Sequence, residues 1–179
     1  MRLFLAIDLP KKTKKDLEFQ IREIKKDYPQ FSWVSSDNYH ITAHFFGEVK
    51  NKKRIKERIK NILYDQGDFY LYSLKAGLFI NIKITIYLEF RREKKIEKLA
   101  AKISSSFGET FVRRKFLPHL TLARTRIPSK QQYFVIKKRL EKLKIDLQFH
   151  VKEVYLFQSI LGGKKPVYKK LARFPLIKE

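Results

Sequence analysis

The sequence contains no cysteine, and this absence excludes disulfide bonds and thiolate metal sites. A reducing compartment is compatible with the absence but is not established by it. No apolar run reaches the length of a membrane span, and the apolar start at residues 3–7 is too short for a secretory signal peptide. We therefore expect a soluble cytoplasmic protein without a membrane partner.

Glycine and proline are scarce, with six of each in 179 residues. The chain has no Pro/Ser-rich linker and no low-complexity tract, so residues 1–179 are predicted to form a single domain, bilobal if its halves form two tightly packed lobes. Nothing resembles a Walker loop or a glycine-rich nucleotide cradle, so no cofactor is predicted. A hydrophobic fraction of 44% excludes a disordered chain and supplies enough apolar material for a core.

Acidic residues are few: 18 Asp and Glu stand against 41 Lys and Arg, which gives a formal net charge of +23. Such a field attracts polyanions and accelerates their encounter, so RNA, DNA and anionic membrane surfaces all qualify as partners. The alternative is that lysine-rich helix faces, such as those at residues 52–54 and 137–139, only keep the surface solvated. We favour a polyanionic partner, although charge alone does not name the chemistry.

Hydrophobic periodicity predicts strands and helices that alternate irregularly, with several strands adjoining without a helix between them. This order favours an α+β fold with antiparallel sheets over a parallel doubly wound sheet. One predicted helix follows Pro10 and runs to about residue 26, and another is capped by Ser129 and runs to about residue 143. Two more predicted helices contain residues 55–63 and 96–107. The predicted strands span residues 3–7, 31–34, 39–46, 69–80, 83–90, 119–124, 147–157 and 168–174.

A short internal repeat places His40 and Thr42 on one predicted strand and His119 and Thr121 on another. Residues i and i+2 of a strand point to the same face, so each strand presents one imidazole beside one hydroxyl. Imidazole both accepts and donates protons near neutral pH, and a hydroxyl donates to phosphate oxygens. Two such units facing one cleft supply a base, an acid and two phosphate ligands for displacement at a phosphodiester without a metal.

Either His-x-Thr unit alone is a common chance pattern, but two of the four histidines of the chain lie in the pair. His44 follows His40 by four residues and is predicted on the same strand face. A metal site at these two residues would need carboxylates at a ligand spacing, and none is present, so no metal is predicted. His150 has no partner pattern and is predicted at the surface or on an edge strand.

Longer motifs surround the two units, and with them the chain resembles the RNA 2′,3′-cyclic phosphodiesterases, also called 2′-5′ RNA ligases, of the two-histidine phosphoesterase superfamily. The resemblance implies a bilobal fold in which two antiparallel sheets face a central cleft, with helices outside. It rests on residues 2–10, 33–34, 38–42, 45–49, 116–124 and 154–159, on Gly163, Tyr168 and Leu171, and on residues 173–176.

The resemblance also implies roles for individual residues. His40 and His119 are expected to be catalytic, and Thr42 and Thr121 to hold the phosphate. Arg124 is a further candidate phosphate ligand. Its odd offset from His119 puts it on the opposite face of an ideal strand, so it would have to reach round or follow a bulge.

Two phenylalanines and one histidine complete the candidate site. Phe45 and Phe116 flank the motifs and are candidates for stacking on a base, with core packing as the equal alternative. The chain departs from the family where Ala43 and His44 replace a leucine and a basic residue, and His44 is a candidate phosphate contact if protonated. Relatives often have a tryptophan near residues 83–87, which is absent here, so base preference stays open.

The resemblance implies hydrolysis of RNA 2′,3′-cyclic phosphate ends to 2′-phosphates, and in reverse a 2′-5′ ligation without ATP. The sequence does not decide which histidine is the base. One alternative is cleavage of 2′-5′-linked oligonucleotides, and another is an RNA-binding module without turnover. A role at a membrane surface is the weakest, because no amphipathic helix with an aromatic-rich face stands out. We expect a monomer whose partner is RNA.

Overall fold

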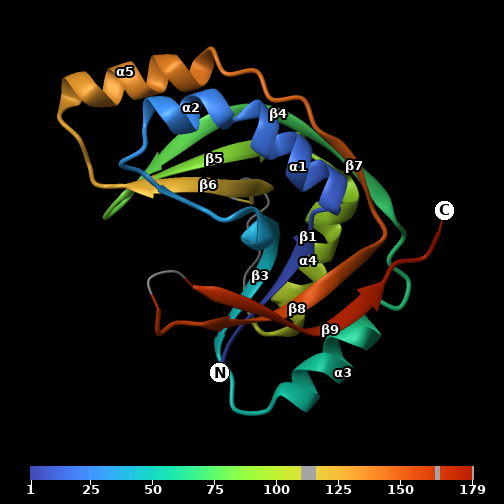
Figure 1. The fold of residues 1–179 in the computed structure, drawn as a ribbon. Coiled ribbons are helices and arrows are strands. Elements are labelled where there is room, and N and C mark those ends of the chain that lie inside the picture. Colours follow the sequence, from blue (N-terminus) through green and yellow to red (C-terminus); the bar gives the residue numbers. More distant parts are fainter. Residues whose placement is uncertain (110–115, 164–165, 179) are drawn as a thin grey trace.

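The computed structural model describes residues 1–109, 116–163 and 166–178 as an α+β fold (Figure 1). The helices are α1 (Lys11–Gln20), α2 (Arg22–Asp27), α3 (Lys52–Ile62), α4 (Lys94–Ser106) and α5 (Lys130–Glu141), with a short 3-10 turn at Ser36–Asn38. The strands are β1 (Arg2–Asp8), β2 (Ser32–Trp33), β3 (His40–Glu48), β4 (Phe69–Ile80), β5 (Ile84–Phe90), β6 (His119–Thr125), β7 (Gln148–Val151), β8 (Glu153–Ile160) and β9 (Val167–Pro175).

The named strands pair in the order β7-β4-β5-β6-β3-β1-β8-β9, with β2 added beside β6, and every one of these pairs is antiparallel. The two predicted sheets are the two halves of this order. They meet where β3 pairs with β6 through Ile41 and Leu120. Each half therefore contributes to the junction one motif strand, that is, one strand that carries a His-x-Thr unit. The predicted antiparallel α+β class is confirmed.

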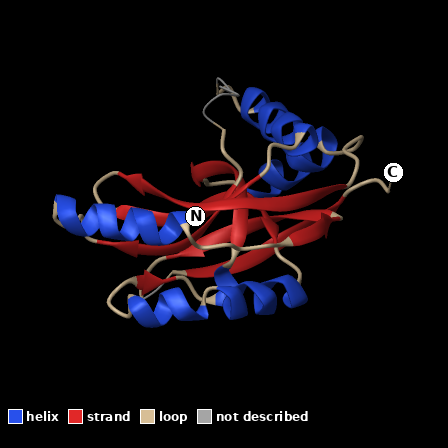
Figure 2. Cartoon of the chain, turned by 90° about the horizontal axis from the view of Figure 1, so that it is seen from above, coloured by secondary structure: helices blue, strands red, loops and turns tan. Residues whose placement is uncertain are grey.

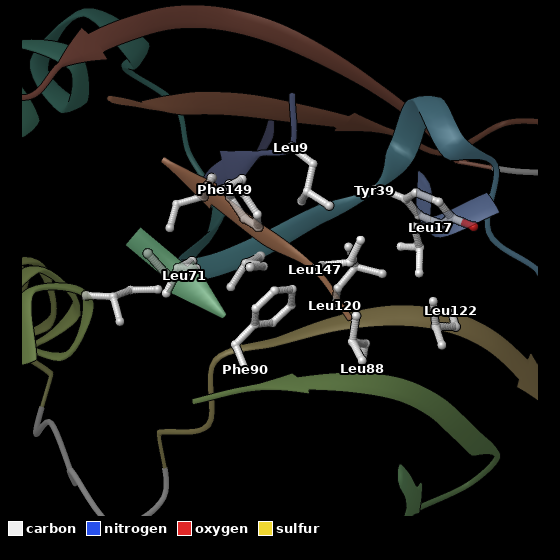
Figure 3. Packing of buried hydrophobic residues seen from close by; sticks show 14 of the residues in the cluster. Leu9, Leu17, Tyr39, Leu71, Leu88, Phe90, Leu120, Leu122, Leu147 and Phe149 are labelled. Atoms are coloured by element: carbon white, nitrogen blue, oxygen red, sulfur yellow. The ribbon is translucent and has the colours of Figure 1, made fainter. Parts of the chain in front are cut away.

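One core cluster runs through both halves and includes the inward residues of the two motif strands. Tyr39, Leu88, Leu120 and Leu122 are buried in it beside helix residues such as Leu17 (Figure 3). Burial of apolar area at roughly 25 cal/mol per Å² makes this packing the main favourable contribution to folding. The residues on either side of Leu120 point away from the core and into the cleft. The strand alternation that buries Leu120 therefore also directs the side chains of the His-x-Thr unit into the cleft.

The helices lie outside the strands, as predicted (Figure 2). Ser129 begins α5 with a capping box, in which its side chain accepts from the Gln132 amide and the Gln132 side chain accepts from the Ser129 amide. In the described part of the chain, no helix offers the long apolar stretch that a membrane span requires.

Two predicted elements are divided in the structure. The helix predicted from after Pro10 to about residue 26 breaks at Ile21, which leaves helical geometry with ψ near 2° and separates α1 from α2. The predicted strand at residues 147–157 is wrong as a single strand, because it forms β7 at one end of the strand order and β8 near the other. Buried positions shift phase at Lys152, from Phe149 and Val151 to Val154 and Leu156, so the two runs face different partners.

Candidate active site

A cavity of about 460 Å³ lies over the β3–β6 junction and is lined from both halves of the strand order. The two His-x-Thr units meet in it. Around Ile41 and Leu120, an antiparallel register brings Thr42 toward His119 and His40 toward Thr121. Its lining residues are Arg2, Phe4, Val34, Asn38, His40, Thr42, Phe45, Phe79, Thr85, His119, Thr121, Arg124, Ser159, Leu161, Pro166 and Tyr168.

The two imidazoles are held by the same kind of hydrogen bond to the backbone. Nδ1 of His40 lies 2.7 Å from the carbonyl oxygen of Asn38, and Nδ1 of His119 lies 2.8 Å from that of Leu117. A carbonyl only accepts, so each Nδ1 carries a proton and donates it. In the neutral ring Nε2 then keeps its lone pair. Each histidine is thereby ready to exchange a proton through Nε2.

Aromatic rings surround both imidazoles but come from different strands. His40 lies 5.0 Å from Phe4 and 5.0 Å, edge-on, from Tyr168. His119 meets the rings of Phe79 at 5.3 Å and Tyr87 at 5.8 Å, both near perpendicular. These rings restrict the orientation of each imidazole and reduce its contact with water.

The protonation of His40 reflects this environment. Burial lowers the pKa of His40, and electrostatic interaction with Arg124 and His119 lowers it further, while the Asn38 carbonyl and the Asp8 carboxylate act in the opposite direction. Asp8 lies opposite His40 in the β1–β3 register and pairs with Lys14 at 2.6 Å and Lys170 at 2.5 Å. His40 is therefore biased toward the neutral form.

A β-bulge brings Arg124 to the cavity. Ile86 pairs with Ala123 and the next residue, Tyr87, pairs with Thr121, so Leu122 is an extra residue in β6. Leu122 and Ala123 are both buried, and the strand then presents Arg124 on the face of His119 and Thr121. The guanidinium therefore lines the cavity without reaching round the strand.

A second bulge corrects the predicted position of His44. Leu5 pairs with His44 and Ala6 pairs with Thr42, so Ala43 is an extra residue in β3. The prediction that His44 shares a face with His40 is wrong, because the bulge turns His44 into the interior and presents Phe45 to the cavity instead. Phe45 thus occupies in β3 the position that Arg124 occupies in β6.

His44 is 6% exposed and packs against α4 and the residues that follow it. Its Nδ1 lies 3.2 Å from Oγ of Ser104, and its ring meets those of Phe46 and Phe107. Burial lowers the pKa of His44, with a smaller opposing effect from the Glu109 carboxylate. A phosphate contact through a protonated His44 is therefore disfavoured by both its position and its charge state.

Two other residues singled out in the sequence lie outside the first cavity. Phe116 is half-buried, packs against the main core and lines an adjacent cavity that also contacts His119. His150 lies on the terminal strand β7, stacked on Tyr70, with Nε2 2.8 Å from Asp68. Its predicted edge-strand location is confirmed. Within the described residues, no three His, Asp or Glu side chains gather as metal ligands.

Sequence reasoning missed several cavity residues, among them Arg2, Phe4, Phe79 and Tyr168. Alternation places Arg2 and Phe4 on one face of β1, opposite the core residues Leu3 and Leu5, so a partial signal was present. Phe79 and Tyr168 are brought beside the histidines only by the pairing of β4 with β5 and of β8 with β9, which the sequence does not reveal.

Comparison with known proteins gives the class that this fold and paired-histidine cavity define. The family model of the 2′-5′ RNA ligase superfamily matches residues 12–162. The chain therefore belongs to the 2′-5′ RNA ligase superfamily.

Individual relatives are similar to this chain over almost its whole length. A protein of Methanocaldococcus jannaschii named RNA 2′,3′-cyclic phosphodiesterase is 30% identical, over 94% of this chain and 97% of its own. An Archaeoglobus fulgidus protein of the same name is 27% identical, over 97% and 99%. The crystal structure of E. coli LigT complexed with 3′-AMP superimposes with a TM-score of 0.75 at 25% identity and covers 98% of this chain and 97% of LigT.

Proposed function

We propose that this protein is an RNA 2′,3′-cyclic phosphodiesterase that opens cyclic phosphate ends to 2′-phosphates. The observation that carries the proposal is the pair of imidazoles in one cavity, each with Nδ1 bonded to a backbone carbonyl and Nε2 left for proton exchange. The relatives named for this reaction and the net charge of +23, which suits a polyanionic substrate, support it.

In the proposed reaction one histidine accepts a proton from water through Nε2 as the water oxygen attacks phosphorus. The bond from phosphorus to the 3′ oxygen breaks, and the other histidine, protonated, donates its proton to that oxygen. Thr42 and Thr121 donate hydrogen bonds to the non-bridging oxygens, and the Arg124 guanidinium stabilises the added negative charge of the transition state. Proton transfer at the two ring nitrogens suffices for these steps, so we propose that the reaction is independent of a metal.

The same geometry supports ligation. A 5′-hydroxyl that takes the place of water as nucleophile would bond to phosphorus and release the 3′ oxygen, and this forms a 2′-5′ linkage without ATP. The two sequence-based alternatives, cleavage of 2′-5′-linked oligonucleotides and RNA binding without turnover, differ from the proposal in substrate or in rate. A monomeric state, a cytoplasmic location and a single bilobal domain stay predictions.

The test is incubation of the pure protein, in excess EDTA, with a short RNA that ends in a 2′,3′-cyclic phosphate. Wild type is compared with His40→Ala and His119→Ala, and the phosphate isomer of the product is identified. A 2′-phosphate formed by wild type alone supports the reaction, the histidine pair and metal independence together. A wild-type protein that leaves the cyclic end intact contradicts the proposal and directs attention to 2′-5′-linked substrates.

A further inference from the structure

A second cavity, of about 550 Å³, adjoins the first along a shared wall. Thr42, Phe45, Phe79 and His119 line both cavities. A phosphorus atom held between Thr42 and His119 would lie at the boundary. A nucleoside bonded to one side of that phosphate would occupy the first cavity, and a group bonded to its other side would enter the second.

The lining of the second cavity suits a nucleoside. Phe116 joins the shared rings of Phe45 and Phe79, so much of the wall is aromatic and able to contact a base. Glu109 adds a carboxylate whose side chain is 58% exposed. An ionised carboxylate only accepts hydrogen bonds and repels phosphate. It therefore matches hydroxyl donors, and carboxylates recognise ribose hydroxyls in other nucleotide sites.

Beneath Glu109 lies a polar atom that has no hydrogen-bond partner in the described part of the chain. Nε2 of His44 is buried and makes no hydrogen bond with the described residues, and Oε1 of Glu109 lies 3.7 Å from it. An unbonded buried donor or acceptor costs on the order of 1–3 kcal/mol. A small movement of the carboxylate would close this distance, so His44 is placed to position Glu109 from below.

We infer that the second cavity binds the nucleoside on the 5′-oxygen side of the reacting phosphate, with Glu109 accepting its ribose hydroxyls. The inference rests on the proposed function and extends it to the 2′-5′ linkage. In ligation, the 5′ oxygen of this nucleoside bonds to phosphorus and the 3′ oxygen leaves. One histidine takes the 5′-hydroxyl proton and the other supplies a proton to the 3′ oxygen. Cleavage of the linkage is the reverse.

The decisive measurement is the affinity that the second nucleoside adds. Calorimetry compares 2′-5′-linked adenylyl-adenosine with the methyl phosphodiester of adenosine 2′-phosphate, which carries the same charge but lacks the second nucleoside. Ligand integrity is checked after each titration. Wild type should bind the linked compound about tenfold more tightly, a difference of roughly 1.4 kcal/mol. A third ligand lacks the 2′-hydroxyl of the second ribose and should lose most of this advantage.

Three variants assign the effect. Glu109→Gln keeps the size of an exposed side chain but removes the anionic acceptor, and His44→Phe keeps a ring beneath it but removes Nε2. Both should reduce the advantage to about twofold or less, because the charge-assisted hydrogen bond from the ribose to the carboxylate is lost or weakened. Glu141→Gln makes the same charge change at an exposed position on α5 and should retain the full advantage.

The outcomes separate the two proposals. An advantage that is absent in wild type, or that survives in Glu109→Gln, overturns the second nucleoside site. An equal loss of affinity for both ligands in the variants also overturns it, because that indicates a general structural effect. The proposed function is tested separately by hydrolysis of adenosine 2′,3′-cyclic phosphate. Wild type that binds the linked compound through Glu109 but leaves the cyclic phosphate intact contradicts the proposed function alone.

Discussion

The two motif strands, β3 and β6, share the same local backbone structure but place different side chains in the cavity. Each carries a His-x-Thr unit, each bonds its histidine Nδ1 to a carbonyl two residues before, and each has a bulge directly after the threonine. The residue that each bulge turns into the cavity differs: β3 presents Phe45 and β6 presents Arg124. Symmetry of the backbone therefore places an imidazole on each strand, while the residue after each bulge makes the two sides of the cavity different, with an aromatic ring on one and a cation on the other.

The largest expected effect comes from removing either half of the pair. His40→Ala and His119→Ala should each lower kcat/KM for a cyclic phosphate by roughly 10²–10⁴-fold, because each removes one proton-transfer group. His150→Ala, on the terminal strand β7, is the matched control and should stay near wild type. Circular dichroism checks that all three fold. Near wild-type turnover in either motif variant would refute the paired mechanism.

The next largest effect is expected from the two residues that differ between the strands after the bulge. Arg124→Leu should lower kcat by roughly 10²–10³-fold, as expected for the loss of one charge-stabilising group in the transition state. Phe45→Ala should instead raise KM for RNA, by about tenfold for each stacked base, with little change in kcat. Steady-state kinetics on one RNA substrate measures both. Equal effects on kcat would show that the two positions are not differentiated.

The two threonines should behave alike, because the backbone structure around them is the same in both strands. Thr42→Val and Thr121→Val keep the side-chain shape and remove one donor to an anionic oxygen, so each should lower kcat/KM by about 10–100-fold. Serine at either position should restore much of the rate. Thr125→Val, at the end of β6, is the control. A loss in only one of the two valine variants would place the phosphate nearer to one strand.

The smallest effect concerns the pH profile. One limb of kcat/KM should lie below the usual histidine range, because burial lowers the pKa of His40. Arg124→Leu removes a charge that lowers this pKa, so the limb should move to higher pH. Asp8→Asn removes a charge that raises it, so the limb should move to lower pH. Shifts of the same sign in both variants would contradict this electrostatic account.

The sequence by itself determined the antiparallel α+β class, most element positions and the presentation of each histidine beside its threonine. These follow from local rules, since a strand alternates its faces at every residue. The longer motifs added the expectation of one cleft with both units in it, which the structure provides. The charge of +23 indicates a polyanionic partner from composition alone, because a field of one sign acts at a distance whatever the fold.

Tertiary structure alone decided which of the residues that follow the two His-x-Thr units face the cavity. Arg124 faces the cavity and His44 does not, because each bulge is a mismatch between two paired strands and cannot be seen in one strand alone. The run at residues 147–157 divides between the two halves because its parts pair with β4 and β1, which are far apart in sequence. Alternation is a property of one strand, whereas register belongs to a pair, and the cavity is built from both.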